Sequence, residues 1–385
     1  MSKIKRTAGA FLALALMFLS VSGLFAHAVE LTEVKAKSAI LIEPQTGQVI
    51  FEQNADEKLP EASVTKVMTI LLVMEAINEG KFGLDDVITC SDYAASMGGS
   101  QIWLEPGEKM TVDDLLKAMI IASANDAAVA LGEAVSGSND AFVARMNERA
   151  AELGMTGTVY KNCTGLHDEG HYTTARDIAI VTAELLKYPL VFDYTTVWMD
   201  YLRDGKTELV NTNKLLRGYV GINGMKTGTT SEAGKCLSAT AERDGFALVA
   251  VVLGSETSDD RFRSARQLLD YGFANYEMFA PQLPADLLGT VKVKGGMEKE
   301  AAVSCPGFDE VLIPKGKGAE IEVAVDIAGA VEAPVEPGQT VGKVTLSLEG
   351  KEIAVREIKT TEGVKKITAG RIFKKILSAL LNLSQ

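Results

Sequence analysis

The sequence predicts an α/β (α+β) domain, in which helices flank an antiparallel sheet and form a helical lobe, followed by a small all-β domain. Three observations carry this prediction. Strand patterns stand at both ends of residues 39–253, and helical patterns lie between them. The composition changes to short Val-rich segments after Pro281. A chain of 385 residues that is 47% hydrophobic is also long enough for two domains with sizeable cores.

The first elements predicted after the leader are a β-hairpin and a buried helix. Residues Ala39–Glu43 and Gln48–Glu52 read as strands around a Pro-Gln-Thr-Gly turn. The next segment, Ser63–Asn78, is apolar at nearly every position that is not Thr, Lys or Glu, and Gly80 ends it. A helix that is apolar all round is expected in the core.

The middle of the chain predicts the helical lobe. Between about 110 and 190, helical stretches such as Val112–Ile121 and Asn139–Leu153 alternate with short Gly-bearing loops. Strand patterns return at Leu237–Ala241 and Ala247–Leu253, before a further helix. A sheet that begins with the first hairpin and closes with these strands brings both ends of the domain together.

The C-terminal part predicts a β domain and a terminal helix. Its expected strands are Gly289–Val293, Val311–Ile313, Glu320–Val325 and Val341–Leu348. The predicted division of the chain is a leader at 1–28, an α+β domain at 29–277, a β-rich domain at 283–365 and a helix at 367–385.

The first thirty residues predict an export signal. Lys3, Lys5 and Arg6 precede an apolar run at 8–25, and Ala26-His27-Ala28 then supplies the small-x-small pattern of a cleavage site. A retained membrane anchor is the alternative, but the run is short for a span. We therefore expect a mature chain beginning near Val29, exported to the outer face of a bacterial cell membrane.

Composition excludes several classes of partner. A net charge of −12 and a pI near 5.0 argue against nucleic acid, which needs clustered Lys and Arg. Only His167 and His171 follow the leader and no H-E-x-x-H occurs, so neither a metal nor another cofactor is expected. Export permits disulfides, but the spacing leaves their presence open for the four cysteines Cys90, Cys163, Cys236 and Cys305.

A first chemical motif stands at the start of the buried helix, where Ser63 precedes Lys66 by three residues. Residues i and i+3 share a helix face, so the lysine lies within reach of the hydroxyl as a base. The helix start also aims free N–H groups at the same point. In the alternative, Ser63 is a helix cap and Lys66 a solvated lysine. A lysine on a helix that is apolar all round favours the chemical interpretation.

Two further motifs follow in order. Ser123-Ala124-Asn125 separates two helical runs, so it either delivers a hydroxyl and an amide into a cleft or merely holds a cap at Asn125 or Asp126. Lys226-Thr227-Gly228 offers a charge and a hydroxyl for a carboxylate, beside a glycine that permits close approach. Taken alone, this third motif reads as a turn.

The three motifs, S-x-x-K, S-x-N and K-T-G in this order, resemble those of the serine penicillin-recognising enzymes. The flanking segments narrow the resemblance to the low-molecular-weight D-Ala-D-Ala carboxypeptidases, from about Lys37 to Leu253, and imply a β-lactamase/transpeptidase-like fold. The β-rich segment also fits that family's C-terminal domain. The segments that carry the resemblance are EASVTKVMT, LLKAMIIASANDAAVALGE, KNCTGLHDEGHYTTARDIA, NTNKLL and GINGMKTGTTSEAGKCLSATAERDG.

The resemblance implies a role for each motif residue. Ser63 would be the acylated nucleophile and Lys66 its general base. Ser123 would relay a proton to the leaving amine, while Asn125 holds the substrate and the base.

For the third motif, the resemblance implies that Lys226 and Thr227 bind the terminal carboxylate of the substrate. The backbone N–H groups of Ser63 and Thr229 would form the oxyanion hole. The family often has His at the position of Thr229, so a side-chain role there is in doubt. The implied substrate is a peptidoglycan stem peptide ending in D-Ala-D-Ala, and β-lactams would act as inhibitors.

Two other functions compete with a carboxypeptidase. A class A β-lactamase needs a Glu with Asn four places on, which is absent between Ala141 and Leu190, and the extra β domain also argues against it. A sensor or scaffold that is acylated without turnover stays open. A Ser-His-Asp hydrolase would have to recruit His167 or His171, and no G-x-S-x-G occurs.

The C-terminal tail predicts a membrane-surface helix. The tail is rich in Lys and Arg although the chain as a whole is acidic, and its apolar residues recur every three or four positions. Such a helix is too short and too charged to span a bilayer but can lie in its interface, and carboxypeptidases of the resembling family are similarly tethered. The alternative is a helix packed on the β domain. The cations are Lys365, Lys366, Arg371, Lys374 and Lys375, and the apolar residues are Ile372, Phe373, Ile376, Leu377, Leu380 and Leu381.

Overall fold

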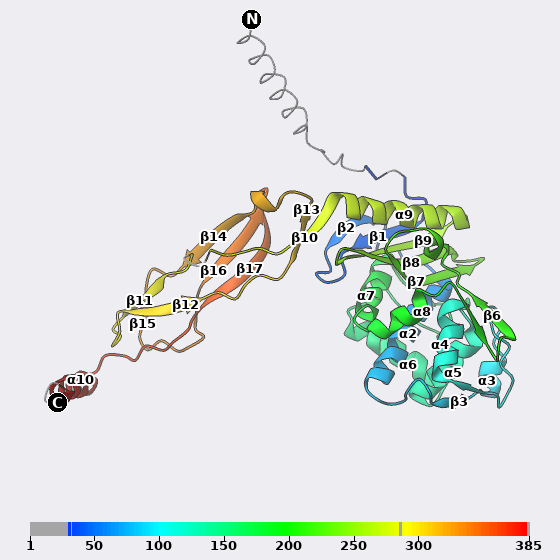
Figure 1. The fold of residues 1–385 in the computed structure, drawn as a ribbon, viewed down its shortest axis with the longest axis horizontal. Coiled ribbons are helices and arrows are strands. Elements are labelled where there is room, and N and C mark those ends of the chain that lie inside the picture. The colour runs from blue at the N-terminus through cyan, green and yellow to red at the C-terminus, as the bar shows by residue number, and fades with distance from the viewer. Residues whose placement is uncertain (1–29, 32, 285–286, 383–385) are drawn as a thin grey trace, which may run out of the picture.

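The computed structural model describes residues 30–31, 33–284 and 287–382 (Figure 1). The predicted leader at 1–28 lies outside the described residues. The remainder forms an α+β domain followed by an all-β domain, as the sequence predicts.

A five-stranded antiparallel sheet is the centre of the first domain. Its order is β2-β1-β9-β8-β7, so the first hairpin pairs directly with a strand some 200 residues later in the chain. The register between β1 and β9 pairs buried residues with buried residues: Leu41 of β1 is opposite Ala250 of β9, and both are buried. The strands are β1 (Ser38–Ile42), β2 (Val49–Gln53), β7 (Ile222–Thr230), β8 (Gly234–Arg243) and β9 (Phe246–Ser255).

Helices cover both faces of this sheet (Figure 1). The lobe with α2 and α7 packs on one face around a core that includes Ile40 and Val251, while α9 (Ser258–Asn275) packs Leu268 and Leu269 on the other. The long helices of the lobe are α2 (Lys66–Asn78), α4 (Val112–Ile121), α5 (Asn125–Ser136), α6 (Asn139–Glu152) and α7 (Ala175–Leu185).

Short elements connect the lobe to the sheet. The chain enters α2 through a 3-10 turn, η1 (Ala62–Thr65). A second hairpin, β5 (Met199–Leu202) with β6 (Thr207–Val210), leads back to β7. The other short elements are β3 (Val87–Thr89), α3 (Asp92–Ala95), β4 (Lys109–Thr111), η2 (Pro189–Val191), α8 (Phe192–Thr195) and η3 (Lys214–Arg217).

The C-terminal domain is a six-stranded sheet with the order β14-β16-β17-β12-β11-β15. The sequence predicts β11, β14 and β16 approximately, but not β12, β15 or β17. Its strands are β11 (Thr290–Lys294), β12 (Glu300–Ser304), β14 (Glu322–Ile327), β15 (Val331–Glu332), β16 (Thr340–Leu348) and β17 (Lys351–Thr360), with a 3-10 turn η4 (Gly318–Glu320).

A two-stranded sheet joins the domains. β10 (Tyr276–Phe279) follows α9 and pairs with β13 (Val311–Pro314) from the later part of the chain. Leu312 of β13 is buried in the same core as Leu268, so the predicted strand at 311–313 belongs to the junction rather than to the six-stranded sheet.

The last element of the described residues is helix α10 (Ala369–Asn382), which Figure 1 shows at the far end of the molecule from the first domain. Among the described residues, no helix has the length and apolar character that crossing a membrane requires.

Candidate active site

The first motif lies at the junction of η1 and α2. Ser63 is only partly buried, whereas the side chain of Lys66, the first residue of α2, is fully buried. The Lys66 Nζ atom donates a hydrogen bond of 3.1 Å to Ser63 Oγ. Neither η1 nor α2 has a side-chain cap, so the interpretation of Ser63 as a helix cap and Lys66 as a solvated lysine is wrong.

The second motif meets the first through Lys66. Its Nζ atom also donates to Asn125 Oδ1 at 2.5 Å and to the Thr164 carbonyl oxygen at 2.7 Å. The Asn125 amide nitrogen donates to the Gly98 carbonyl oxygen at 2.7 Å. Three acceptors therefore hold the amine of Lys66 in one position.

Ser123 precedes α5 in a left-handed conformation, with φ of +65°, and is buried. Such a backbone places the side chain where a regular helix would not, which is common at functional sites. The cap alternative does not hold for Asn125, because Ala124 is the N-cap of α5 and the Asn125 side chain is bound to Lys66 and Gly98. Asp126 does bind the first turn of α5, since its carboxylate accepts from the backbone N–H of Ala127 at 2.9 Å, and it also accepts from the backbone N–H of Leu104 at 3.0 Å.

The third motif lies on strand β7 rather than in a turn. Lys226 is buried, and its Nζ atom donates to the Thr227 carbonyl oxygen at 3.0 Å. The Thr227 hydroxyl donates to the hydroxyl of Thr212 at 2.6 Å. The Thr229 hydroxyl donates to the Gly228 carbonyl oxygen at 2.8 Å, so its side chain is bound to the strand itself.

Gly228 explains how β7 comes so close to the nucleophile. A Cβ atom at this position would lie 2.5 Å from the Glu61 carbonyl oxygen and 3.0 Å from the backbone nitrogens of Ser63 and Val64. Any side chain would push β7 away from η1. Arg261 of α9 supports the same stretch by donating to the Gly228 carbonyl oxygen at 3.1 Å.

Burial controls the protonation of Lys66. Removing the ammonium group from water lowers its pKa from 10.5 to about 7. The negative charge of Asp126 opposes this shift. Burial raises the pKa of the Cys163 thiol to about 12, so this neighbour is neutral at pH 7 and adds no charge there. A substantial fraction of Lys66 is therefore neutral near pH 7 and can accept a proton.

Burial is the main cause of the lowered pKa of Lys66, and the charge of Lys226 is not needed to explain it. The repulsion is found at Lys226, where burial first, and then the charges of Lys66 and Arg261, hold the pKa well below 10.5. An arriving carboxylate would provide the opposite charge that this buried ammonium lacks.

A buried cluster under η1 is a feature that sequence reasoning missed. Glu61 Oε1 lies 2.9 Å from His171 Nε2 and accepts from the Thr65 hydroxyl at 2.9 Å. His171 Nδ1 accepts from the Lys161 backbone N–H at 3.0 Å. This histidine is thus bound beneath the nucleophile's turn and makes no hydrogen bond with Ser63 among the described residues, which argues against a Ser-His-Asp triad.

The four cysteines carry no disulfide. All are free thiols, and Cys90, Cys163 and Cys236 are buried. The sequence left this question open. In the structure Cys90, Cys163 and Cys236 pack in a core of the first domain, whereas Cys305 lies partly buried against the core of the C-terminal domain.

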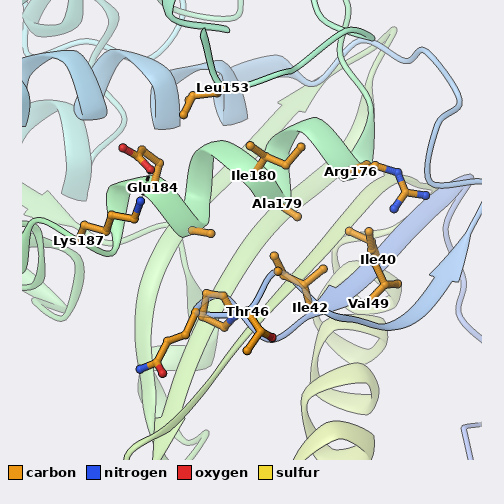
Figure 2. A pocket seen from close by; sticks show the side chains of 14 residues that line it. Ile40, Ile42, Thr46, Val49, Leu153, Arg176, Ala179, Ile180, Glu184 and Lys187 are labelled. Atoms are coloured by element: carbon orange, nitrogen blue, oxygen red, sulfur yellow. Dashed lines mark hydrogen bonds and ion pairs between the residues drawn. The ribbon is translucent and has the colours of Figure 1, made fainter. Parts of the chain in front are cut away.

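A separate hollow lies at the opposite edge of the sheet, between the β1–β2 hairpin and α7 (Figure 2). Ile40, Ile42, Val49 and Ile180 form its apolar walls, with Arg176 and Lys187 at its ends. No residue of the three motifs lines it, so it is distinct from the site around Ser63.

Two family models match the chain. One, described as D-alanyl-D-alanine carboxypeptidase, matches residues 25–257. The other, described as penicillin-binding protein 5, C-terminal domain, matches residues 276–366. The two matches together cover the five-stranded sheet, the helical lobe and the all-β domain, and α9 lies between them.

Relatives match over most of their length. The chain is 43% identical over 336 residues to D-alanyl-D-alanine carboxypeptidase DacF of Bacillus subtilis, covering 86% of each chain. It is 34% identical over 362 residues to DacC of Escherichia coli, covering 91% of this chain and 90% of the other. Penicillin-binding protein 5 from Haemophilus influenzae has a TM-score of 0.78 at 30% identity, covering 88% of this chain and all (100%) of that chain. An ampicillin-bound penicillin-binding protein D2 from Listeria monocytogenes, at 32% identity and a TM-score of 0.56, covers 64% of this chain and 100% of its own.

Proposed function

The chain belongs to the D-alanyl-D-alanine carboxypeptidase family, and on that premise we propose that it removes the terminal D-Ala from peptidoglycan stem peptides through an acyl-enzyme on Ser63. One observation carries the proposal. The amine of Lys66 is buried, has a pKa lowered to about 7 and lies 3.1 Å from Ser63 Oγ. A serine paired with a neutral amine at physiological pH is an activated nucleophile.

In the acylation step, Ser63 Oγ attacks the carbonyl carbon between the two D-alanines and its proton passes to Lys66 Nζ. The carbonyl oxygen becomes an oxyanion, which the backbone N–H groups of Ser63 and Thr229 stabilise. The C–N bond then breaks, and the hydroxyl of Ser123 relays a proton to the departing amine. D-Ala leaves, and the rest of the peptide remains esterified to Ser63.

The terminal carboxylate of the substrate is bound by Lys226 and Thr227. Its negative charge would stabilise the ammonium form of Lys226, whose pKa is lowered by burial in the free protein. The Thr227 hydroxyl donates to Thr212 in the free protein and would turn its proton to the carboxylate when the substrate binds. An amide at the same position would lack the charge, so the site selects a free C-terminus.

Water completes the cycle by attacking the ester carbonyl carbon, after which the Ser63 oxygen takes back a proton and the shortened peptide leaves. A β-lactam would follow the first half of this route. Its ring carbonyl would acylate Ser63, and the ester would persist because the opened ring remains attached.

Release of D-alanine tests the proposal. The protein should liberate one D-Ala per molecule from a stem pentapeptide ending in D-Ala-D-Ala, with turnover beyond one equivalent. The same peptide ending in D-Ala-L-Ala is the matched control, and Ser63→Ala should release none. A single burst of one equivalent without turnover would instead identify a non-hydrolysing sensor, and faster hydrolysis of penicillin than of peptide would identify a β-lactamase.

We also propose that the mature chain works outside the cell membrane and that α10 attaches it to the lipid surface. The apolar side chains of Ile372, Phe373, Ile376 and Leu377 are exposed, which the alternative of packing on the β domain does not explain. Arg371 is exposed beside them. An apolar face next to cations suits the interface of an anionic bilayer.

A further inference from the structure

Trp103 is held on the surface near the active site at an energetic cost. It is one of two tryptophans in the chain, and 71% of its side chain is exposed. Its backbone adopts a left-handed φ of +56°, which is disfavoured for a bulky residue. An exposed aromatic ring on a strained backbone suggests a binding role.

The surrounding contacts fix this loop. The buried carboxylate of Asp126 accepts from the backbone N–H groups on both sides of Trp103, at 3.1 Å from Ile102 and 3.0 Å from Leu104. From the β5–β6 hairpin, Arg203 donates to the Ile102 carbonyl oxygen at 2.8 Å. The ring is therefore presented by a rigid support, which reduces the entropy lost when a ligand binds.

A cleft of about 590 Å³ lies beside the ring, between this loop and the β5–β6 hairpin. Arg203 pairs with Glu108 in its wall at 2.8 Å. Within the described residues, no ion pair involves the three other charged side chains that line the cleft. These are Glu105, Lys206 and Glu208.

Short stretches of chain connect the cleft to residues that contact the three motifs. Trp103 is three residues from Ser100, whose carbonyl oxygen accepts from the Asn125 backbone N–H at 2.7 Å. Three residues reach at most about 11 Å. On the other side, Thr207 begins β6, and five residues later Thr212 contacts Thr227 at 2.6 Å. Five residues span at most about 17 Å.

These upper limits can be compared with the length of the substrate. A stem peptide of about five residues spans about 17 Å when extended. With its D-Ala terminus at Lys226 and its scissile bond at Ser63, the four residues before that bond extend about 13 Å, which is long enough for the amino-terminal end to approach the cleft. The sugar that carries the stem peptide in peptidoglycan is attached at that end.

We propose that the cleft walled by Trp103 binds an amino-sugar ring of the glycan to which the stem peptide is attached. This inference rests on the proposed function. The ring's C–H face packs on the indole, while its hydroxyl and amide groups bond with the charged side chains. Binding the remote sugar stabilises the transition state at Ser63, so kcat/KM rises for glycan-linked substrate.

Three substrates test the proposal: a diacylated tripeptide ending in D-Ala-D-Ala, the free stem pentapeptide, and the same pentapeptide carrying its disaccharide. Wild type should hydrolyse the third with the highest kcat/KM. Trp103→Ala should lower kcat/KM about tenfold on the third substrate alone. Trp103→Phe should recover most of the loss, because it keeps an aromatic face. Phe373→Ala is the matched control, since this ring is 66% exposed but lies on α10.

Other results overturn the proposal. A Trp103→Ala loss that is equal on all three substrates indicates a structural role, and a loss on the free pentapeptide indicates a peptide subsite. An unchanged variant excludes a role for the ring. Direct binding separates this inference from the proposed function. In Trp198→Phe, the fluorescence of Trp103 should respond to the disaccharide-tetrapeptide, which lacks the scissile bond, and no response would refute glycan binding whatever the peptidase assay shows.

Discussion

The Nζ atom of Lys66 lies 2.5 Å from Oδ1 of Asn125, so the first residues of α2 and α5 meet at the amine. The two residues come from motifs 59 positions apart in the chain. Because the Asn125 amide also donates to Gly98, its oxygen cannot turn away without losing that bond. The base is therefore held in position by the neighbouring motif as well as by its own helix.

Acylation should depend on pH through Lys66. The pKa of this amine is lowered to about 7, and only the neutral form accepts the proton of Ser63. The second-order rate constant for acylation by a penicillin should therefore increase with pH through about 7 and level off above about 8. Stopped-flow measurements between pH 5 and pH 9 would show this profile.

The matched variant is Lys66→Arg, which keeps a positive charge but cannot be deprotonated in this range. We expect its acylation rate to fall by at least about a thousandfold at every pH, as loss of a base next to a nucleophile commonly costs. Acylation at the wild-type rate in this variant would exclude Lys66 as the base.

Stability should also reflect the buried amine. Because the pKa of Lys66 is about 7 in the folded chain against 10.5 in the unfolded chain, the unfolded chain binds more protons between these values. The free energy of unfolding should therefore increase with pH across this window, by at most about 1.4 kcal/mol per pH unit from this group. Below about pH 7 both states are protonated and the dependence disappears.

Denaturant titrations of wild type and Lys66→Met would measure this contribution. Because the charge of Lys66 also lowers the pKa of Lys226, the difference between the two curves reports Lys66 together with its effect on Lys226. A difference that does not vary with pH would show that the amine is solvated in the folded protein.

A penicillin should label Ser63 alone. The hydroxyl is partly exposed and lies 3.1 Å from the Lys66 amine, whereas Ser123 is buried and its hydroxyl makes no hydrogen bond to a base among the described residues. Mass spectrometry of a peptic digest should locate the adduct in the peptide that contains residue 63. An adduct on another residue, or undiminished labelling of Ser63→Ala, contradicts the assignment.

Gly228 should be intolerant of any side chain. Alanine would place a Cβ atom 2.5 Å from the Glu61 carbonyl oxygen, so β7 must move away from η1. We expect Gly228→Ala to lower the acylation rate by about a hundredfold and stability by about 1–3 kcal/mol. Gly98→Ala is the control near the same site, because nothing lies within 4 Å of its Cβ position. Equal behaviour of the two variants would refute the close-approach argument.

Sequence patterns predicted the elements whose burial is one-sided or uniform. The hairpin was predicted from two strand segments around the turn at residues 44–47, and Val112–Ile121 from its helical spacing; both were confirmed. Lys66 was recognisable because a lysine on an apolar helix conflicts with its surroundings. That conflict between a residue and its local pattern was the strongest signal in the chain.

The sequence did not reveal β7, because its central positions carry buried polar residues instead of the apolar run of a doubly covered strand. β17 was missed for a related reason, since charged residues interrupt its pattern from Lys351 onward. The contact between Glu61 and His171 joins residues 110 positions apart, and no local pattern carries such information. It depends on how η1 packs against a distant loop.

Removing the tail should release the enzyme from membranes without inactivating it. Deleting residues 368–385 takes away α10, whose exposed Ile372, Phe373, Ile376 and Leu377 make no part of the site around Ser63. The truncated mature chain should remain in the supernatant after vesicles of anionic lipid are sedimented, and it should release D-Ala at the full rate. Because lipid binding adds apolar burial to charge attraction, 0.5 M salt should weaken the binding of the full chain only partly, whereas Phe373→Asp should weaken it strongly. Sedimentation of the truncated chain to the same extent as the full chain would show that the attachment lies elsewhere.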